Sequence, residues 1–290
     1  YALLDLLEGR QLERFGPYVV DRPFAPAAAL AADDSPPAPE WTTADLRFER
    51  WHGHGRWRLA DDQALPEAWT MRHEGLTFEL RPTETGQVGF FGDQVSNWRW
   101  LRERITAPPR RGAAARPPGP IRVLNLFAYT GGSTLAAAKA GAEVTHVDAS
   151  RPSMAWARRN AELSGLADAP IRWIVDDALA FAEREARRGR RYDGFVIDPP
   201  SFGHGPKGTR WELADALPDL LEACAAVAAD DAFALLTAHT TGLAADDLGD
   251  ALVDAFDPGP GSDVRAEWME LRATSGATLP LGVAARLTRE

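Results

Sequence analysis

Cysteine is almost absent from this chain, which has one cysteine, Cys224, among 290 residues. A single thiol excludes an internal disulfide framework and a cysteine-based zinc site, and it is typical of a reducing compartment, so we expect a cytoplasmic protein. Long apolar runs are also missing, so the sequence predicts no membrane-spanning segment. The N-terminal stretch YALLDLLEGR lacks the basic region and cleavage site of a signal peptide.

Lysine is nearly as scarce, with only Lys139 and Lys207, so arginine supplies almost all of the positive charge. The net charge of −10 does not indicate nucleic-acid binding, which usually shows as a basic excess. Arginines nevertheless gather in residues 99–122 and again in residues 184–191. Each cluster is either a solvated surface or a patch that faces phosphate, and the sequence leaves both readings open.

The first third of the chain predicts a small β-rich domain. Residues 1–30 have a mildly helical pattern, and four later segments alternate as strands do. We expect strands and one helix as follows: a hairpin of 46–51 with 56–60, a hairpin of 69–73 with 76–81 around Glu74-Gly75, a strand at 88–91 and a helix at 97–105. Residues 107–120, rich in proline, glycine and arginine, indicate a linker. The predicted domains are therefore 1–106, a linker at 107–120, and 121–290.

Strands and helices alternate beyond the linker, which predicts a mostly parallel sheet covered on both faces. The expected strands are 121–127, 143–148, 171–175, 192–197 and 232–238, and the expected helices are 132–140, 150–164, 178–188, 218–229 and 243–256. We expect Ser150 as an N-cap, Gly189 at a helix end and Pro218 at the first position of a helix. Two last strands, 264–273 and 279–287, suggest an antiparallel edge. The fold class is thus α/β, of the Rossmann-like kind.

Ligands of such sheets bind beyond the carboxyl ends of the strands. The first of these loops, NLFAYTGGST, lacks G-x-G-x-x-G, which argues against a nicotinamide-dependent oxidoreductase. Asp148 ends the second strand, where an acid suits ribose hydroxyls, although it could equally cap a helix. Asp176 and Asp177 end the third strand; one of them, Asp177 by preference, could accept from an adenine amine, and the other is a cap or simply exposed. Together these positions match adenosine binding without a pyrophosphate.

The loop sequence, the D-P-P-S-F motif at 198–202 and FFGDQVSNWRW at 90–100 carry a family resemblance. They resemble class I S-adenosylmethionine-dependent methyltransferases, and more narrowly the bacterial 23S ribosomal RNA large-subunit methyltransferases with cytosine-C5 and guanine-N7 branches. The likeness covers roughly Val88 to the C-terminus, and no PUA domain is recognisable. It implies S-adenosylmethionine as cofactor and a sheet of seven strands.

The resemblance also implies residue roles. Phe127, Ala128, Tyr129, Thr130 and Gly131 would surround the methionine part of the cofactor. Asp148 would hold the ribose, Asp177 the adenine amine, and Asp198 would lie beside the methyl group. We add these neighbouring positions as cofactor contacts: Asn125, Ala149, Asp176 and Gln94.

The acceptor atom depends on whether a nucleophilic cysteine is present. C5 methylation of cytosine needs a cysteine that adds to C6. The resemblance implies that it would lie in the D-P-P motif or after the fifth strand, where this chain reads DPPSF and LLTAHTTG, and Ser201 is too weak a nucleophile to replace it. Cys224, on the helix before the fifth strand, fits a buried apolar role better. A nitrogen acceptor is therefore favoured, with Asp198, the carbonyl of Pro199 and the ring of Phe202 at the acceptor and with Pro200 and Ser201 completing the loop. Ser201 stands where amine methyltransferases with a D-P-P-aromatic motif carry the aromatic residue, so the motif is closer to the guanine-N7 branch. A ring nitrogen and an exocyclic amine both stay open as the acceptor.

The glycine-rich loop that follows holds Lys207 and Arg210, which either meet a phosphate of the substrate or belong to an ordinary surface loop. The six histidines show no ligand-like spacing, so we expect no metal site. The leading hypothesis is methylation of a base nitrogen in RNA, most plausibly ribosomal RNA. The alternatives are methylation of a protein side chain or small molecule, and a non-catalytic protein that binds RNA or the ribosome. The oligomeric state is not readable from the sequence.

Overall fold

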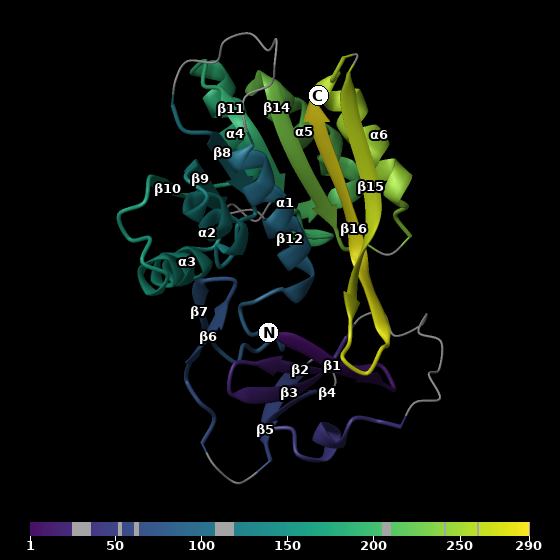
Figure 1. Ribbon diagram of the computed structural model, residues 1–290. Helices are drawn as coiled ribbons and strands as arrows, with labels where there is room; N and C mark the ends of the chain where they lie inside the picture. The colour runs from purple at the N-terminus through teal and green to yellow at the C-terminus, as the bar shows by residue number, and fades with distance from the viewer. Residues whose placement is uncertain are drawn as a thin grey trace. The chain divides into compact units, whose positions relative to one another are not determined.

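The computed structural model in Figure 1 describes residues 1–24, 36–51, 54–60, 64–107, 119–204, 210–240, 242–259 and 261–289. The chain forms two compact units, Tyr1–Asp93 with Glu270–Pro280, and Gln94–Met269 with Leu281–Glu290. The N-terminal part of the first unit ends at Asp93, before the segment that the sequence indicates as a linker. Residues 108–118 of that segment lie outside the described ranges.

The first unit is built on a five-stranded sheet in the order β1-β2-β3-β4-β5 and a separate hairpin, β6-β7. Its strands are β1 (Ala2–Leu7), β2 (Arg10–Phe15), β3 (Tyr18–Pro23), β4 (Leu46–Trp51), β5 (His54–Leu59), β6 (Trp69–His73) and β7 (Leu76–Leu80). The two hairpins predicted from the alternating pattern are confirmed.

The helical expectation for residues 1–30 is wrong for the described part, which forms β1, β2 and β3. The reason is a pair of tight turns that the leucine-rich composition obscures. Glu8 and Gly9 have φ values of 48° and 78°, and Gly16 has 66°, so the chain reverses at intervals too short for a helix. The expected strand at 88–91 is also wrong, because those residues form a loop in which Gly89 has φ of 92°.

The second unit contains a seven-stranded sheet in the order β10-β9-β8-β11-β14-β16-β15. Its strands are β8 (Arg122–Leu126), β9 (Glu143–Asp148), β10 (Ile171–Val175), β11 (Tyr192–Ile197), β14 (Ala228–Ala238), β15 (Ser262–Arg272) and β16 (Thr278–Arg289). The first five pair in parallel, and β16 pairs antiparallel with β14. The predicted α/β fold with an antiparallel C-terminal edge is confirmed.

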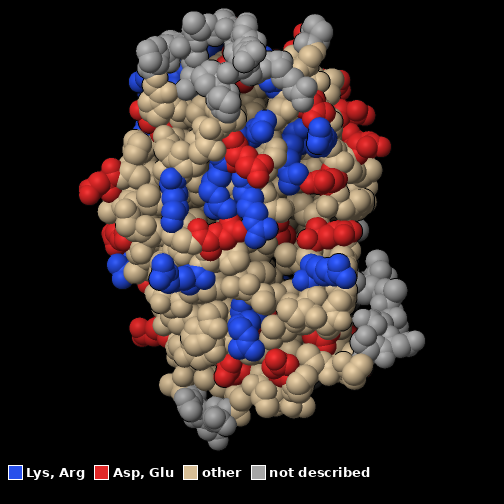
Figure 2. All heavy atoms as spheres, in the orientation of Figure 1, with Lys and Arg blue, Asp and Glu red and all other residues tan. Residues whose placement is uncertain are grey.

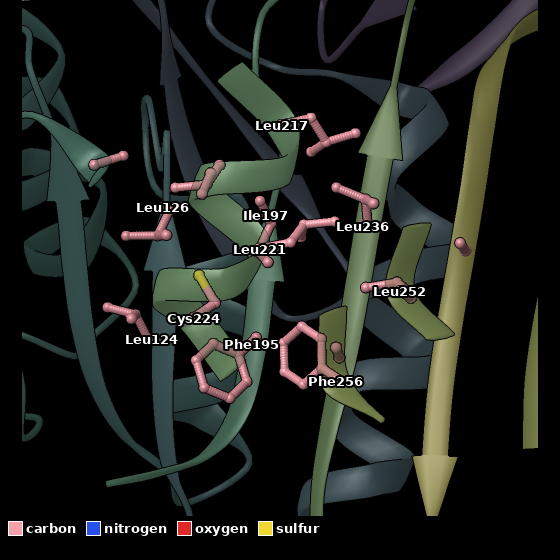
Figure 3. Packing of buried hydrophobic residues seen from close by; sticks show 14 of the residues in the cluster. Leu124, Leu126, Phe195, Ile197, Leu217, Leu221, Cys224, Leu236, Leu252 and Phe256 are labelled. Atoms are coloured by element: carbon pink, nitrogen blue, oxygen red, sulfur yellow. The ribbon is translucent and has the colours of Figure 1, made fainter. Parts of the chain in front are cut away.

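Helices cover both faces of this sheet (Figure 1). They are α1 (Val95–Thr106), α2 (Gly132–Lys139), α3 (Arg151–Leu163), α4 (Ala178–Arg187), α5 (Leu213–Ala225) and α6 (Ala245–Phe256). Leu124, Phe195 and Leu236 pack with α4, α5 and α6 (Figure 3). Val123 and Leu235, which alternate with them, pack with α1 and α2. Both faces are buried, which explains the near-continuous apolar strands. None of the described helices is long and apolar enough to span a bilayer.

Two of the three expected helix signals are confirmed. Ser150 caps α3 by accepting the N–H of Ser153 at 3.2 Å, and Gly189 follows α4 with φ of 63°. The third is wrong, because α5 begins at Leu213 and Pro218 lies inside it. The earlier start follows from a bond outside the helix, in which the N–H of Leu213 donates to the Ser201 carbonyl at 3.1 Å. That bond satisfies a backbone group which a helix leaves without a partner at its first turn.

Candidate active site

The carboxyl ends of β8, β9, β10, β11 and β14 meet at one edge of the sheet, because these strands are neighbours and parallel. That edge therefore brings together the loop after β8 and the acids Asp148, Asp176 and Asp198. This edge of the sheet and the residues around it belong to the second unit.

The loop after β8 is curled by alternating left-handed residues. Phe127, Tyr129 and Gly131 have φ values of 57°, 47° and 89°. The N–H of Ala128 donates to the Val147 carbonyl at 3.1 Å, which ties the loop to β9. A Cβ on Gly131 would lie 3.2 Å from the Cβ of Ala157, so glycine lets the loop approach α3. The loop therefore has a shape that few other sequences would adopt.

A buried chain of hydrogen bonds supports this loop from below. The amide of Asn125 donates to Thr134 Oγ1 at 2.8 Å, and Thr134 Oγ1 lies 2.9 Å from His146 Nδ1. The Thr134 hydroxyl thus joins the Asn125 amide to the His146 ring. Burial, and to a smaller extent the nearby Arg158, lowers the pKa of His146 to about 3. The predicted cofactor residue Asn125 is thus engaged beneath the loop.

Asp148 holds the loop and the start of α3 at once. Its Oδ2 accepts the N–H of Tyr129 at 2.8 Å, and its Oδ1 accepts the N–H of Ser150 at 2.8 Å. Burial raises the pKa of the Asp148 carboxyl, while these two N–H groups act to lower it. Each carboxylate oxygen has a second acceptor site, so the group is able to take hydroxyl donors as well. Ala149, beside it, is exposed.

The two acids after β10 have different partners. Asp177 caps α4 by accepting the N–H of Ala180 at 3.0 Å. Asp176 accepts the N–H of Asp177 at 2.9 Å and forms an ion pair with Arg184. Asp177, the acid that the sequence favours for an adenine amine, is therefore the residue that caps α4. Its assignment to adenine stays a prediction.

Asp198, at the end of β11, is held by side chains from two other segments. Thr237 donates its hydroxyl to Oδ1, and Gln94 Nε2 donates to Oδ2 at 3.4 Å. His239 Nε2 lies 3.6 Å from Oδ1. The two hydrogen bonds from Thr237 and Gln94 fix the plane of the carboxylate while leaving about a third of the side chain, 32%, exposed.

A buried relay stands behind Gln94. Arg286 donates to Asn97 Oδ1 at 2.7 Å, and the Asn97 amide donates to Gln94 Oε1 at 2.9 Å. Each bond fixes the orientation of the next amide, so the nitrogen of Gln94 is the atom that faces Asp198. Sequence reasoning placed Gln94 near the site and counted His239 only as one of the residues that follow a strand end, and it missed Asn97 and Arg286. The position of His239 directly after a predicted strand is the one sequence signal that pointed to this residue.

The loop after Asp198 is anchored at two successive residues. Trp211 Nε1 donates to the Pro200 carbonyl at 2.7 Å, and Thr240 Oγ1 donates to Ser201 Oγ at 2.8 Å. Phe202 is 65% exposed and begins a short hairpin of β12 (Phe202–His204) and β13 (Arg210–Glu212) that the sequence did not predict. Lys207 and the side chain of Arg210 lie outside the described part of the chain.

Cys224 lies away from this site, inside the core between the sheet and α5 (Figure 3). It is a free, fully buried cysteine, and burial raises the pKa of its thiol to about 12. The expected apolar role is confirmed. Within the described ranges, no group of three or more His, Cys, Asp or Glu side chains is placed to hold a metal ion.

The comparison with known proteins identifies the family. A profile of S-adenosylmethionine-dependent methyltransferases matches residues 39–229, about two thirds of the chain. The chain belongs to this family. The expected enzyme class and cofactor are thereby confirmed, and the curled loop with the acid at the end of β9 fits a nucleoside with ribose hydroxyls.

A methyltransferase of solved structure from Agrobacterium tumefaciens is 36% identical, with a TM-score of 0.88 over 100% of this chain and 90% of that one. Ribosomal RNA large subunit methyltransferase I of Aeromonas salmonicida is 36% identical over 117 residues, which are 40% of this chain and 26% of the relative. Ribosomal RNA large subunit methyltransferase K/L of Methylococcus capsulatus is 35% identical over 140 residues, 47% of this chain and 18% of the relative. This methyltransferase thus matches only about a quarter or less of these two curated relatives.

Proposed function

We propose that this methyltransferase methylates a nitrogen of a base in RNA, with ribosomal RNA as the substrate. The observation that carries the proposal is that the Asp198 carboxylate is held in place at the site while Cys224 is buried in the core. A C5 route needs a cysteine at the base, and the single cysteine of this chain lies in the core. An exocyclic amine acceptor needs instead a carboxylate or carbonyl that accepts a hydrogen bond from it, which Asp198 and Pro199 supply, and a ring nitrogen needs no cysteine either.

The cofactor end of the site is assigned to the loop and the acids after β9 and β10. Residues 127–131 enclose the methionine part, Asp148 accepts from the ribose hydroxyls, and Asp177 accepts from the adenine amine. The bound cofactor supplies an electrophilic methyl group on a sulfonium, which is a good leaving group. The chain's own task is then mainly to position the acceptor in line with that methyl group.

The acceptor end is assigned to Asp198 and the loop that follows it. The exposed ring of Phe202 offers a stacking surface for a base, an interaction worth about 1–3 kcal/mol in proteins that bind single strands. Two relatives named as ribosomal RNA methyltransferases, similar over part of their length, support RNA as the substrate class.

Charge favours a second candidate, which is methylation of a small molecule or protein side chain. The chain has a net charge of −10, and on the face in Figure 2 basic and acidic side chains are interspersed. The arginines of the second cluster are largely ion-paired, with Arg184 on Asp176 and Arg188 on Glu185. That cluster therefore behaves as a solvated surface of α4.

Mapping methylated nucleotides in ribosomal RNA from a deletion strain and from wild type tests the proposal. We expect one base methylation to disappear and to return when the gene is restored. If every mark remains while the purified protein binds S-adenosylmethionine, the RNA proposal fails and the second candidate takes its place.

A further inference from the structure

His239 lies between two groups that fix the positions of its ring nitrogens. Nδ1 lies 2.6 Å from the carbonyl oxygen of Leu281, and Nε2 lies 3.6 Å from Asp198 Oδ1. A carbonyl oxygen only accepts, so Nδ1 must carry a proton. In the neutral ring, Nε2 is then the unprotonated nitrogen, and it is the nitrogen on the side of Asp198.

The backbone of β16 is shaped to make this contact. Gly282, next to Leu281, has φ of 145°, a conformation that residues with a side chain rarely adopt. A Cβ at this position would lie 2.4 Å from the Ala238 carbonyl oxygen and 3.0 Å from His239 Nδ1. Glycine therefore permits the close approach that brings the Leu281 carbonyl to the ring.

The chemistry of nitrogen methylation gives such a ring a task. An exocyclic amine must lose a proton when it is methylated, whereas guanine N7 has no proton to lose. We infer that His239 is the base that accepts this proton at Nε2, and hence that the acceptor is an exocyclic amine. The inference rests on the proposed function and narrows it to one class of acceptor.

The amine nitrogen forms a bond to the methyl carbon, and the electron pair of the breaking C–S bond stays on sulfur. The N–H bond then breaks, its electrons remain on nitrogen, and the proton passes to His239 Nε2. The Asp198 carboxylate stabilises the resulting imidazolium, which returns its proton to water; 37% of the His239 side chain is exposed for that exchange.

Nitrogen-15 NMR of the imidazole rings in the ligand-free protein tests the geometry without any turnover. At a pH where the rings are neutral, we expect the proton of His239 on Nδ1. A proton on Nε2 of His239 overturns the inference.

Variants of His239 test the proton transfer. His239→Asn retains an amide that donates to Leu281 but has no atom at the place of Nε2. His239→Gln places an amide nitrogen near Nε2 but has no donor at the place of Nδ1. We expect both to lower kcat about 10²-fold with unchanged affinity for S-adenosylmethionine by calorimetry. Free imidazole should restore part of the activity of His239→Ala. Full activity in all three variants overturns the inference.

Nucleoside analysis of the product separates this inference from the proposed function. We expect a base methylated on its exocyclic amine. Methylation at guanine N7 overturns the role of His239 and leaves RNA methylation intact. An absence of methylated RNA, with the cofactor bound, overturns the proposed function, and the NMR measurement still reports on the ring.

Discussion

The acids at the two ends of the site are held in different ways. At the proposed cofactor end, Asp148 and Asp177 accept from backbone N–H groups two and three residues further along the chain. At the proposed acceptor end, Asp198 is held by Thr237 and by Gln94, which are 39 and 104 residues away in sequence. The first end is built from local turns and caps and from one contact with the loop after β8, the Tyr129 N–H on Asp148, while the second depends on side chains of distant segments.

The two ends should therefore respond differently to substitution. A change of Asp177 removes one helix cap, and a change of Asp148 also weakens the hold on the loop at Tyr129. A change at the proposed acceptor end also misplaces groups on other elements, since Asp198, Gln94 and Asn97 orient one another. We therefore expect substitutions at the two ends to separate cofactor affinity from turnover.

The largest effect is expected at Asp198. Replacing it with alanine should lower methyl transfer by about 10³-fold, because the site loses the charge placed at the acceptor. Calorimetry should show unchanged affinity for S-adenosylmethionine. Asp219→Asn, at an exposed acid of α5, is the control. Undiminished turnover in Asp198→Ala would remove the basis for calling this the acceptor end.

Low pH should destabilise the folded protein at His146, which belongs to the hydrogen-bonded chain beneath the cofactor loop. His146 is neutral when folded, with a pKa of about 3 against 6.5 for an unperturbed ring. The unfolded chain therefore binds a proton below pH 6.5 that the folded chain does not, and stability falls as pH falls toward 3. We expect a loss of about 3 kcal/mol between pH 7 and pH 4 from this residue. Denaturant unfolding measures it, and His146→Asn should flatten that part of the profile; an equal slope in both proteins contradicts the assignment.

Asp148→Asn should weaken cofactor binding by about 2 kcal/mol, because charge-assisted hydrogen bonds are lost and one oxygen becomes a donor facing an N–H. Turnover at saturating cofactor should change little. The comparison between the two ends breaks down if kcat falls and the dissociation constant does not.

The smallest effect is expected from the relay behind Gln94. Asn97→Asp keeps the shape of the side chain and still accepts from Arg286, but it cannot donate to Gln94 Oε1. We expect kcat to fall about fivefold to tenfold, in line with one hydrogen bond worth on the order of 1 kcal/mol. Ser96→Ala, exposed on the same helix, should leave kcat unchanged. Equal values for the two variants show that the relay does not position Asp198.

The same contrast explains what could be predicted from the sequence. Strand ends, the cap at Ser150 and the acid at Asp148 depend on local periodicity and turn chemistry, so they could be read from short stretches. The strands of residues 1–24 could not, because their leucines suggested a helix and only the turns at Gly9 and Gly16 indicated hairpins.

The acceptor end lay beyond such reasoning for a physical reason. Nothing near Asp198 in the chain indicates that Thr237 and His239 lie against its carboxylate, since that contact exists only once β14 pairs beside β11. Gln94 could be placed only through its resemblance to a known family. The start of α5 was also missed, because it depends on the Ser201 carbonyl before the helix.

The burial of Cys224 makes the sole thiol of this chain a natural reporter of core opening. A thiol reacts with an alkylating reagent only when it is both reachable and ionised, and here neither holds while α5 lies on the sheet. The rate of labelling therefore measures how often that layer separates from the strands. A second cysteine added on the surface would take up a dye first, so that distances and motions can be followed without altering the native residue.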